Sequence, residues 1–203
     1  IDQLALAQPP EQGMGPGVGF WGFVEAEDEE AGKALLDAAA DWLRTKGMNR
    51  AMGPLSFSYW DEIGLLVDGF STPPFVLMGH ARPYYGAAIE AQGYRGVKDL
   101  LAYHIRPDFE PPRVMTKLAQ RVSDRVKVRP ARRKHLKEDA AIMLDVFNDA
   151  WEHNWGFVPL VAAEWEETVL TLAKLMPDDY IQIAEYDGEP VAFIVALPIF
   201  LNQ

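Results

Sequence analysis

The chain has 203 residues, of which 49% are hydrophobic, with no cysteine and a formal net charge of −11. This length allows one large domain or two small ones with a sizeable buried core. The lack of cysteine excludes disulfides, thiolate metal sites and a cysteine nucleophile. The acidic balance disfavours nucleic acid as a partner. The longest apolar run, Val191 to Leu201, is shorter than the ~20 residues of a membrane span. We therefore expect a cytoplasmic protein without nucleic-acid or membrane partners.

The first predicted elements form a strand, a helix and a second strand. After a loop rich in proline and glycine (Pro9 to Gly19), Phe20 to Glu25 is a predicted strand and Asp28 to Lys46 a predicted helix. Three acids open this helix, where its dipole favours them, and Gly47 follows its last turn. Arg50 to Phe57 is a predicted strand parallel to the first, which completes a βαβ unit. The side chains expected to form the buried face of the helix are Leu35, Ala38, Ala39 and Trp42.

A second helix and a third strand follow a long connection from Ser58 to Gly79. The helix spans Pro83 to Gln92, with proline at its entry and Gly93 after its end. Lys98 to Ile105 is rich in strand-forming residues and is predicted as a strand. The composition then shifts, because Arg106 to Pro112 contains three prolines, which is typical of a linker.

The remainder of the chain ends in a predicted hairpin. Two strands, Tyr180 to Tyr186 and Glu189 to Leu197, are joined by Asp187-Gly188, a strong hairpin signal. The elements predicted before this hairpin are a short helix over Val114 to Ser123, a strand over Arg125 to Arg129, and helices over Leu136 to Glu152 and Ala162 to Leu175.

Three stretches of sequence together carry a family resemblance. Gly32 to Met48 is similar to the central helix of the GNAT acetyltransferase superfamily, and Tyr84 to Leu100 is similar to the helix and strand that follow it. Ala184 to Phe193 resembles the GNAT hairpin pattern A-E-x-D-G-x-x-V-G-F. The resemblance implies the acyl-CoA N-acyltransferase fold, an α/β (α+β) architecture in which helices flank a mixed sheet.

The order of these stretches indicates two half-units. Residues 1–105 resemble the C-terminal half of one GNAT-like unit, residues 106–124 form a linker, and residues 125–203 resemble the N-terminal half of a second unit. The first residue is Ile1 rather than methionine, and we expect a fragment of a tandem GNAT protein. We hypothesise that the halves complete one sheet, within the chain or by swapping in a homodimer. Two separate, poorly stable half-units are the alternative.

The resemblance also implies a cofactor site at the turn before the central helix. In this superfamily, that turn holds the pyrophosphate of acetyl-CoA through backbone N–H groups and the pattern Q/R-x-x-G-x-G/A. The corresponding residues here run from Glu27 to Gly32, and only Gly32 matches. Ala31, Gly32 and Lys33 are the candidate cofactor-binding residues. The four consecutive acids before them oppose an anionic ligand by on the order of 1 kcal/mol per like-charge pair.

Catalytic candidates are taken from the same resemblance, which implies transfer of an acetyl group to an amine. The family's acid tyrosine would fall at Ile89, and Tyr85 lies one helical turn earlier on the same face. The alternative is that Tyr85 packs its helix against the sheet. His80 is the candidate general base, and a surface histidine is the alternative. The spacing of the histidines does not indicate a metal site.

Aromatic and amide side chains mark a candidate acceptor site. Trp151, Asn154 and Trp155 lie in a helix–loop region that lines the acceptor in GNAT folds, and Tyr59 follows a predicted strand end. The alternative interpretation places the tryptophans in the core and Asn154 in a turn. The expected substrate is a small-molecule amine or other acyl acceptor.

Two hypotheses for function remain after other classes are excluded. The sequence contains no P-loop and no G-x-S-x-G elbow, and its glycine series precedes a strand, which disfavours a Rossmann site. The first hypothesis is a GNAT-type N-acyltransferase that uses acetyl-CoA. The second is a degenerate, non-catalytic GNAT-fold unit that binds a ligand or acts as a scaffold.

Overall fold

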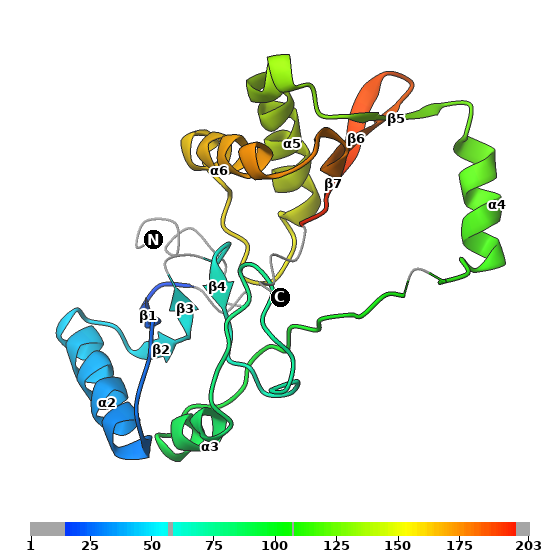
Figure 1. The fold of residues 1–203 in the computed structure, drawn as a ribbon. Helices are drawn as coiled ribbons and strands as arrows, with labels where there is room; N and C mark the ends of the chain where they lie inside the picture. Colours follow the sequence, from blue (N-terminus) through cyan, green and yellow to red (C-terminus); the bar gives the residue numbers. More distant parts are fainter. Residues whose placement is uncertain (1–14, 57–58, 107, 198–203) are drawn as a thin grey trace. The chain divides into compact units, whose positions relative to one another are not determined.

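The computed structural model describes residues 15–56, 59–106 and 108–197, which fold as a mixed α/β protein (Figure 1). The chain divides into two compact units. Unit 1 comprises Ile1–Ala102 together with Trp155–Val158, and unit 2 comprises Tyr103–Asn154 together with Pro159–Gln203. The described strands form three small sheets, two of them in unit 1 and one in unit 2.

Unit 1 begins with the predicted βαβ arrangement. Strand β1 (Val18–Phe20) and strand β2 (Arg50–Met52) pair in parallel, with helix α2 (Glu29–Thr45) between them. The helix prediction is confirmed, and Asp28 is its N-cap, with its carboxylate accepting a 2.8 Å hydrogen bond from the Ala31 backbone N–H. The predicted strand over Phe20 to Glu25 is wrong, because β1 lies earlier and is only three residues long.

The buried face of α2 differs from the prediction. Leu36 and Leu43 are buried, whereas Leu35 and Trp42 are 48% and 60% exposed. Leu36 and Leu43 are seven residues apart and lie along one stripe of the helix, which is turned by one residue from the predicted stripe of Leu35 and Trp42. Leu43 packs directly on Gly19, where an added Cβ would lie 2.4 Å from its side chain.

The predicted strand Arg50 to Phe57 is interrupted. It ends as β2 at Met52, and after Gly53 and Pro54 the chain forms β3 (Leu55–Ser56), which pairs antiparallel with β4 (Glu62–Ile63). Proline has no N–H to donate to a strand ladder. Phe57, the last residue of the prediction, lies outside the described residues.

The next two predictions have opposite outcomes. Helix α3 (Tyr84–Ala91) confirms the helix predicted over Pro83 to Gln92, and it packs against α2. The strand predicted over Lys98 to Ile105 is wrong, since this segment has no regular structure and its Leu101 and Ile105 are 72% and 74% exposed. A strand needs a hydrogen-bonded neighbour, and none of the described strands pairs with this segment.

Unit 2 contains an antiparallel sheet in the order β5-β6-β7. Asp187 and Gly188 form the predicted hairpin turn with positive φ angles of 53° and 91°, so the hairpin prediction is confirmed. The elements of this unit are α4 (Arg113–Val122), β5 (Val126–Pro130), α5 (Leu136–Trp151), α6 (Ala162–Leu175), β6 (Ile181–Tyr186) and β7 (Glu189–Val195), with 3-10 turns at Arg133–His135 and Asp178–Tyr180.

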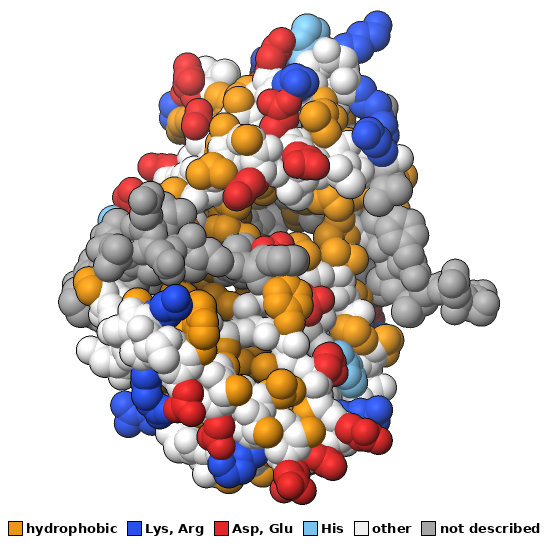
Figure 2. All heavy atoms as spheres, turned by 90° about the vertical axis from the view of Figure 1, so that its left-hand side faces the viewer, with side chains coloured by type: hydrophobic (Ala, Val, Ile, Leu, Met, Phe, Trp, Pro, Cys, Tyr) orange, Lys and Arg blue, Asp and Glu red, His pale blue; other side chains and the backbone are white. Residues whose placement is uncertain are grey.

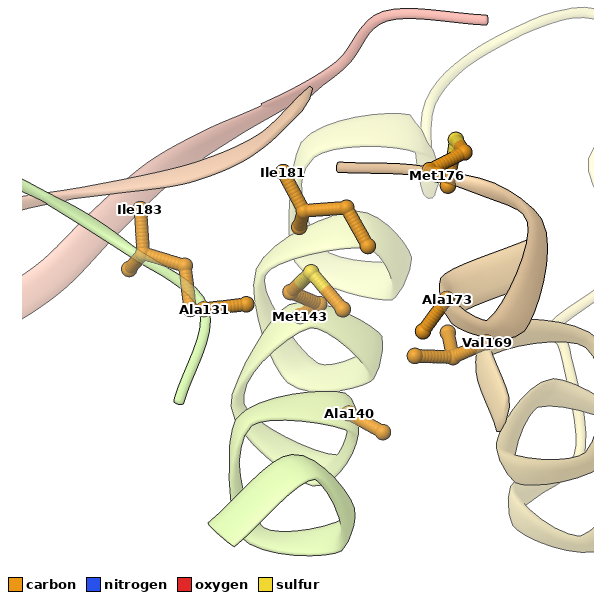
Figure 3. Close-up of a cluster of buried hydrophobic side chains, with 8 residues drawn as sticks. All are labelled: Ala131, Ala140, Met143, Val169, Ala173, Met176, Ile181 and Ile183. Atoms are coloured by element: carbon orange, nitrogen blue, oxygen red, sulfur yellow. The ribbon is translucent and has the colours of Figure 1, made fainter. Parts of the chain in front are cut away.

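The core of unit 2 lies between α5, α6 and one face of the sheet (Figure 3). Met143 from α5 and Ile183 from β6 are completely buried at its centre, and Val169 from α6 closes it. Burial of each such side chain contributes about 1.5–3 kcal/mol to the free energy of unfolding. The other buried members are Ala131, Ala140, Ala173, Met176 and Ile181.

A buried ion-pair network fixes the start of α5 to β5. The carboxylate of Asp139 is completely buried and lies 3.0 Å from Arg129 Nη2 and 2.7 Å from Arg132 Nη2. The backbone N–H of Arg132 donates a further 2.6 Å hydrogen bond to it. Burial favours the neutral acid, but these charged donors outweigh it and lower the pKa of Asp139 to about 2.

Large apolar side chains also reach the surface of the molecule. On the face presented in Figure 2, they lie between acidic and basic groups. Among the described residues, no helix is both long enough and apolar enough to cross a membrane.

Candidate functional site

The turn before α2 is a shallow acidic depression. Glu27, Asp28, Glu29 and Glu30 line it together with Tyr84. Glu29 and Glu30 occupy the first helical turn, where negative charge stabilises the helix dipole. The acids therefore stabilise the helix end that the family resemblance assigns to a pyrophosphate.

The polar groups of the candidate cofactor residues already have partners within the chain. The Ala31 N–H donates to the Asp28 carboxylate, and the Gly32 N–H donates to the Asp28 carbonyl at 3.0 Å. Lys33 pairs with Asp37 on the exposed side of the helix. An added Cβ on Gly32 would meet Ala26 only at 3.5 Å, so no close approach reserves this position for glycine. The turn does not fit the pyrophosphate of acetyl-CoA.

Two tyrosines of α3 hold the chain that leads into this turn. The Tyr85 hydroxyl accepts a 2.7 Å hydrogen bond from the Ala26 N–H and lies 3.4 Å from a carboxylate oxygen of Glu25. The Tyr84 hydroxyl donates to the Ala26 carbonyl at 2.8 Å. Tyr85 is 7% exposed, so the catalytic candidate is a buried side chain whose hydroxyl is bound to the backbone.

His80 belongs to the irregular segment between β4 and α3. Its side chain is exposed. The structure therefore does not bring the two catalytic candidates, His80 and Tyr85, into one hydrogen-bonded constellation.

Four aromatic rings from distant parts of the sequence form an aromatic cluster in unit 1, made of Tyr59, Trp60, Trp155 and Phe157. Tyr59 lies edge-on to Trp60 with ring centroids 5.0 Å apart, and 6.5 Å from Trp155. Trp60 contacts Phe157 at 5.8 Å. Partial burial raises the pKa of the Tyr59 hydroxyl. Two of the four predicted acceptor residues, Tyr59 and Trp155, are thus brought together.

Hydrogen bonds fix the short segment that supplies two of these rings. The Trp60 indole Nε1 donates to the Val158 carbonyl at 2.7 Å. In unit 2, the side-chain amide of Asn148 binds the backbone N–H and carbonyl of Leu160 at 3.0 and 3.2 Å. Val158 and Leu160 are therefore each bound through the backbone by a side chain of their own unit.

The other two predicted acceptor residues belong to unit 2. Trp151 stacks on Phe147 with ring centroids 5.5 Å apart, and Phe147 stacks in turn on Trp165. Asn154 is exposed, and its backbone N–H binds the Trp151 carbonyl at 2.8 Å, as in the alternative interpretation of a turn residue. Trp151 is 40% exposed.

In the sequence, Trp60 and Phe157 lie in the two stretches considered for the acceptor site, but neither is among the candidate residues chosen from them. Trp60 directly follows Tyr59, and Phe157 lies two residues after Trp155. The local signals for the two residues are the aromatic pair before Asp61 and the W-x-F pattern at Trp155. Aromatic faces and edges can line a wall for an aliphatic chain or stack against a cationic amine. The cluster therefore suits recognition of an amphiphilic or amine-bearing ligand.

Among the described residues, no group of three His, Asp or Glu side chains is arranged to bind a metal ion.

Comparison with known proteins gives two relatives of similar sequence. The chain is 40% identical over 186 residues to Protein YghO of Escherichia coli. The aligned residues make up 91% of this chain and 48% of that protein. The chain is 36% identical over 200 residues to Bacterial ceramide synthase of Caulobacter vibrioides, covering 98% of this chain and 51% of that protein. No protein-family model and no solved structure matches the chain. The chain spans about half the length of the curated relatives it matches.

Proposed function

We propose that the complete protein containing this chain is a cytoplasmic N-acyltransferase that moves an acyl group from an acyl-CoA thioester to an amine. The observation that carries the proposal is the 36% identity, over 98% of this chain, to a protein named Bacterial ceramide synthase. A ceramide is an amide of a fatty acid and a long-chain base, so that name describes amide formation at an amine. The GNAT-like sequence motifs point independently to the same class of reaction.

The proposed reaction is a simple acyl transfer. The amine nitrogen attacks the thioester carbonyl carbon, a C–N bond forms, and the C–S bond breaks with release of the thiol. The surplus proton of the amine passes to a base or to solvent. Acetyl-CoA is the smallest donor of this class, and the relative's name extends the proposal to longer acyl groups and to long-chain amines.

The aromatic cluster is the proposed part of the acceptor site in this chain. Tyr59 and Trp155 lie together there, and Trp60 is fixed by its bond to Val158. Rings held in place by such contacts lose little entropy when an amphiphilic amine packs against them. The acyl donor's pyrophosphate is proposed to bind outside the Glu27–Gly32 turn, whose amide donors are occupied.

We also propose the GNAT-type fold, completed by packing of two half-units within the complete protein or by swapping in a homodimer. Support comes from the sheet of unit 2, whose core face is covered by α5 and α6. On its opposite face, Val128 and Ile194 are 64% and 65% exposed. Covering these side chains would remove an apolar surface from water.

The test uses the complete protein with a primary amine carrying a long alkyl chain and a series of acyl-CoA donors from acetyl to palmitoyl. Mass spectrometry of the lipid extract should find the corresponding N-acyl amide for at least one donor. A methyl-blocked tertiary amine of the same chain length is the matched control, because it cannot form a neutral amide. Absence of amide across all donors would overturn the proposal.

A non-catalytic ligand-binding unit is the second candidate, and the occupied donors at Ala31 and Gly32 favour it. Thermal unfolding of the complete protein with acyl-CoA separates the two. A donor present at 100 times its dissociation constant raises the free energy of unfolding by ~2.7 kcal/mol. An amine that stabilises the protein, with no effect of any acyl-CoA, would favour the second candidate.

A further inference from the structure

Helix α4 (Arg113–Val122) is amphipathic, and each of its residues is exposed. Its apolar side chains recur at intervals of three and four residues, which places them on one face of the helix. Leu118, at the centre of this face, is 53% exposed, and none of the ten residues of the helix is buried. The apolar side chains of this face are Val114, Met115, Leu118 and Val122.

A basic stripe runs beside the apolar face. Arg113, Lys117 and Arg121 follow one another at intervals of four, each one residue before a member of the apolar face. At 100° per residue, the two stripes are therefore adjacent on the helix surface. The helix contains no acidic residue, in a chain whose formal net charge is −11. The helix thus combines three positive charges with an exposed apolar face.

A ten-residue helix with no buried residue gains little stability from packing and is marginally stable in water. Burying its apolar face would stabilise it, and any partner must also accept three cations along one side. An anionic lipid surface meets both requirements, because acyl chains take up the apolar side chains while phosphate groups pair with Arg and Lys. The helix is about 15 Å long, too short to span a bilayer and suited to lying in the interface.

We propose that α4 is a membrane-surface helix that docks the protein on anionic lipid. This proposal differs from the sequence-based expectation of no membrane partner. It rests on the helix alone and stands whether or not the complete protein forms amides. If the proposed function also holds, docking brings the protein to the surface where long-chain amines reside.

The test is sedimentation of the complete protein with vesicles of phosphatidylcholine alone and with 30% phosphatidylglycerol. We expect binding to the anionic vesicles only, with the helical signal in circular dichroism rising on binding. Each basic residue near such a surface contributes roughly fivefold to the affinity. The double variant Lys117→Glu/Arg121→Glu should therefore reduce binding by at least about 20-fold, and high salt should weaken the wild type.

Two exposed leucines allow a matched control for the apolar face. Leu118 and Leu35 are 53% and 48% exposed on different helices. Leu118→Ser should weaken vesicle binding, whereas Leu35→Ser should leave it unchanged. Lys134→Glu, at an exposed position outside α4, is the control for charge.

Three outcomes would overturn the proposal. The first is no binding of the wild type to anionic vesicles, and the second is equal effects of the α4 variants and their controls. The third is a change in oligomeric state, measured by light scattering for Leu118→Ser without lipid, because α4 would then contact protein. A null result in the amide assay leaves this test unaffected.

Discussion

The indole of Trp60 donates a 2.7 Å hydrogen bond to the carbonyl of Val158, 98 residues further along the chain. This bond ties the segment Trp155–Val158 into unit 1, although its sequence neighbours on both sides belong to unit 2. Phe157, in the same segment, is buried against the Trp60 ring. The aromatic cluster therefore depends on one polar contact as well as on ring packing.

Trp60→Phe should loosen this segment. The variant keeps an aromatic ring but removes the donor to Val158, and a net hydrogen bond of this kind contributes about 0.5–1.5 kcal/mol. Hydrogen exchange at residues 155–158 should accelerate by about fivefold. Tyr59→Phe retains the ring and is the control. Equal exchange in Trp60→Phe and the wild type would show that the indole bond does not fix the segment.

Tyr85→Phe separates a structural role from a catalytic one. The hydroxyl accepts from the Ala26 N–H at a partly buried site, so its loss should cost about 0.5–1.5 kcal/mol of unfolding free energy. Thermal unfolding measures the loss. If the role of Tyr85 is structural, the variant should melt at a lower temperature than the wild type, while its kcat, measured well below that temperature, should be unchanged. A large fall in kcat at an unchanged melting temperature would instead assign Tyr85 to catalysis.

The stability of unit 2 should depend on acid through Asp139. Its folded pKa of about 2 lies below its ordinary value of 3.8. The carboxylate therefore stabilises the fold above about pH 4, and this contribution, roughly 2 kcal/mol, is lost as the pH falls toward 2. Denaturant unfolding followed from pH 6 to pH 2 tests this. Asp139→Asn should be less stable at pH 6 and should approach the wild type at low pH. A constant difference between the two would contradict the assignment.

Two glycines should respond oppositely to alanine. Gly32 lies inside α2 with only an ordinary contact available to a new Cβ, so Gly32→Ala should raise the unfolding free energy by ~1 kcal/mol. Gly53→Ala places a Cβ 2.4 Å from the Trp21 carbonyl oxygen and should lower the melting temperature strongly. Calorimetry of both variants is the measurement. Destabilisation by Gly32→Ala would mean that the turn needs its glycine after all.

Local signals predicted the helices and the hairpin well. Asp28, Gly47 and Gly93 mark helix ends through backbone chemistry that acts within a few residues, and Asp187-Gly188 sets the hairpin turn in the same way. Strands were predicted less well because a strand depends on its partner. The segment Lys98 to Ile105 has strand-forming residues but no paired neighbour among the described strands.

The candidate site shows the same division between local and long-range information. The acidic turn was visible in the sequence because its residues are consecutive, from Glu27 onward. The contact of Tyr59 with Trp155 joins residues almost a hundred positions apart, and no local pattern encodes such a contact. Likewise, the spacing of Leu35 and Trp42 indicates one helix face, but Leu36 and Leu43 are buried instead, because the tertiary neighbours of α2, which include Gly19 and helix α3, decide which face is covered.

The most direct test of N-acyl transfer is a parallel measurement of free thiol and amide in one reaction of the complete protein with an acyl-CoA and a long-chain primary amine. Acyl transfer to the amine predicts release of one thiol for each amide formed, with both rates rising together as the amine is titrated. Thiol release that is independent of the amine, without amide, would indicate hydrolysis and contradict the proposed function. So would the formation of neither product.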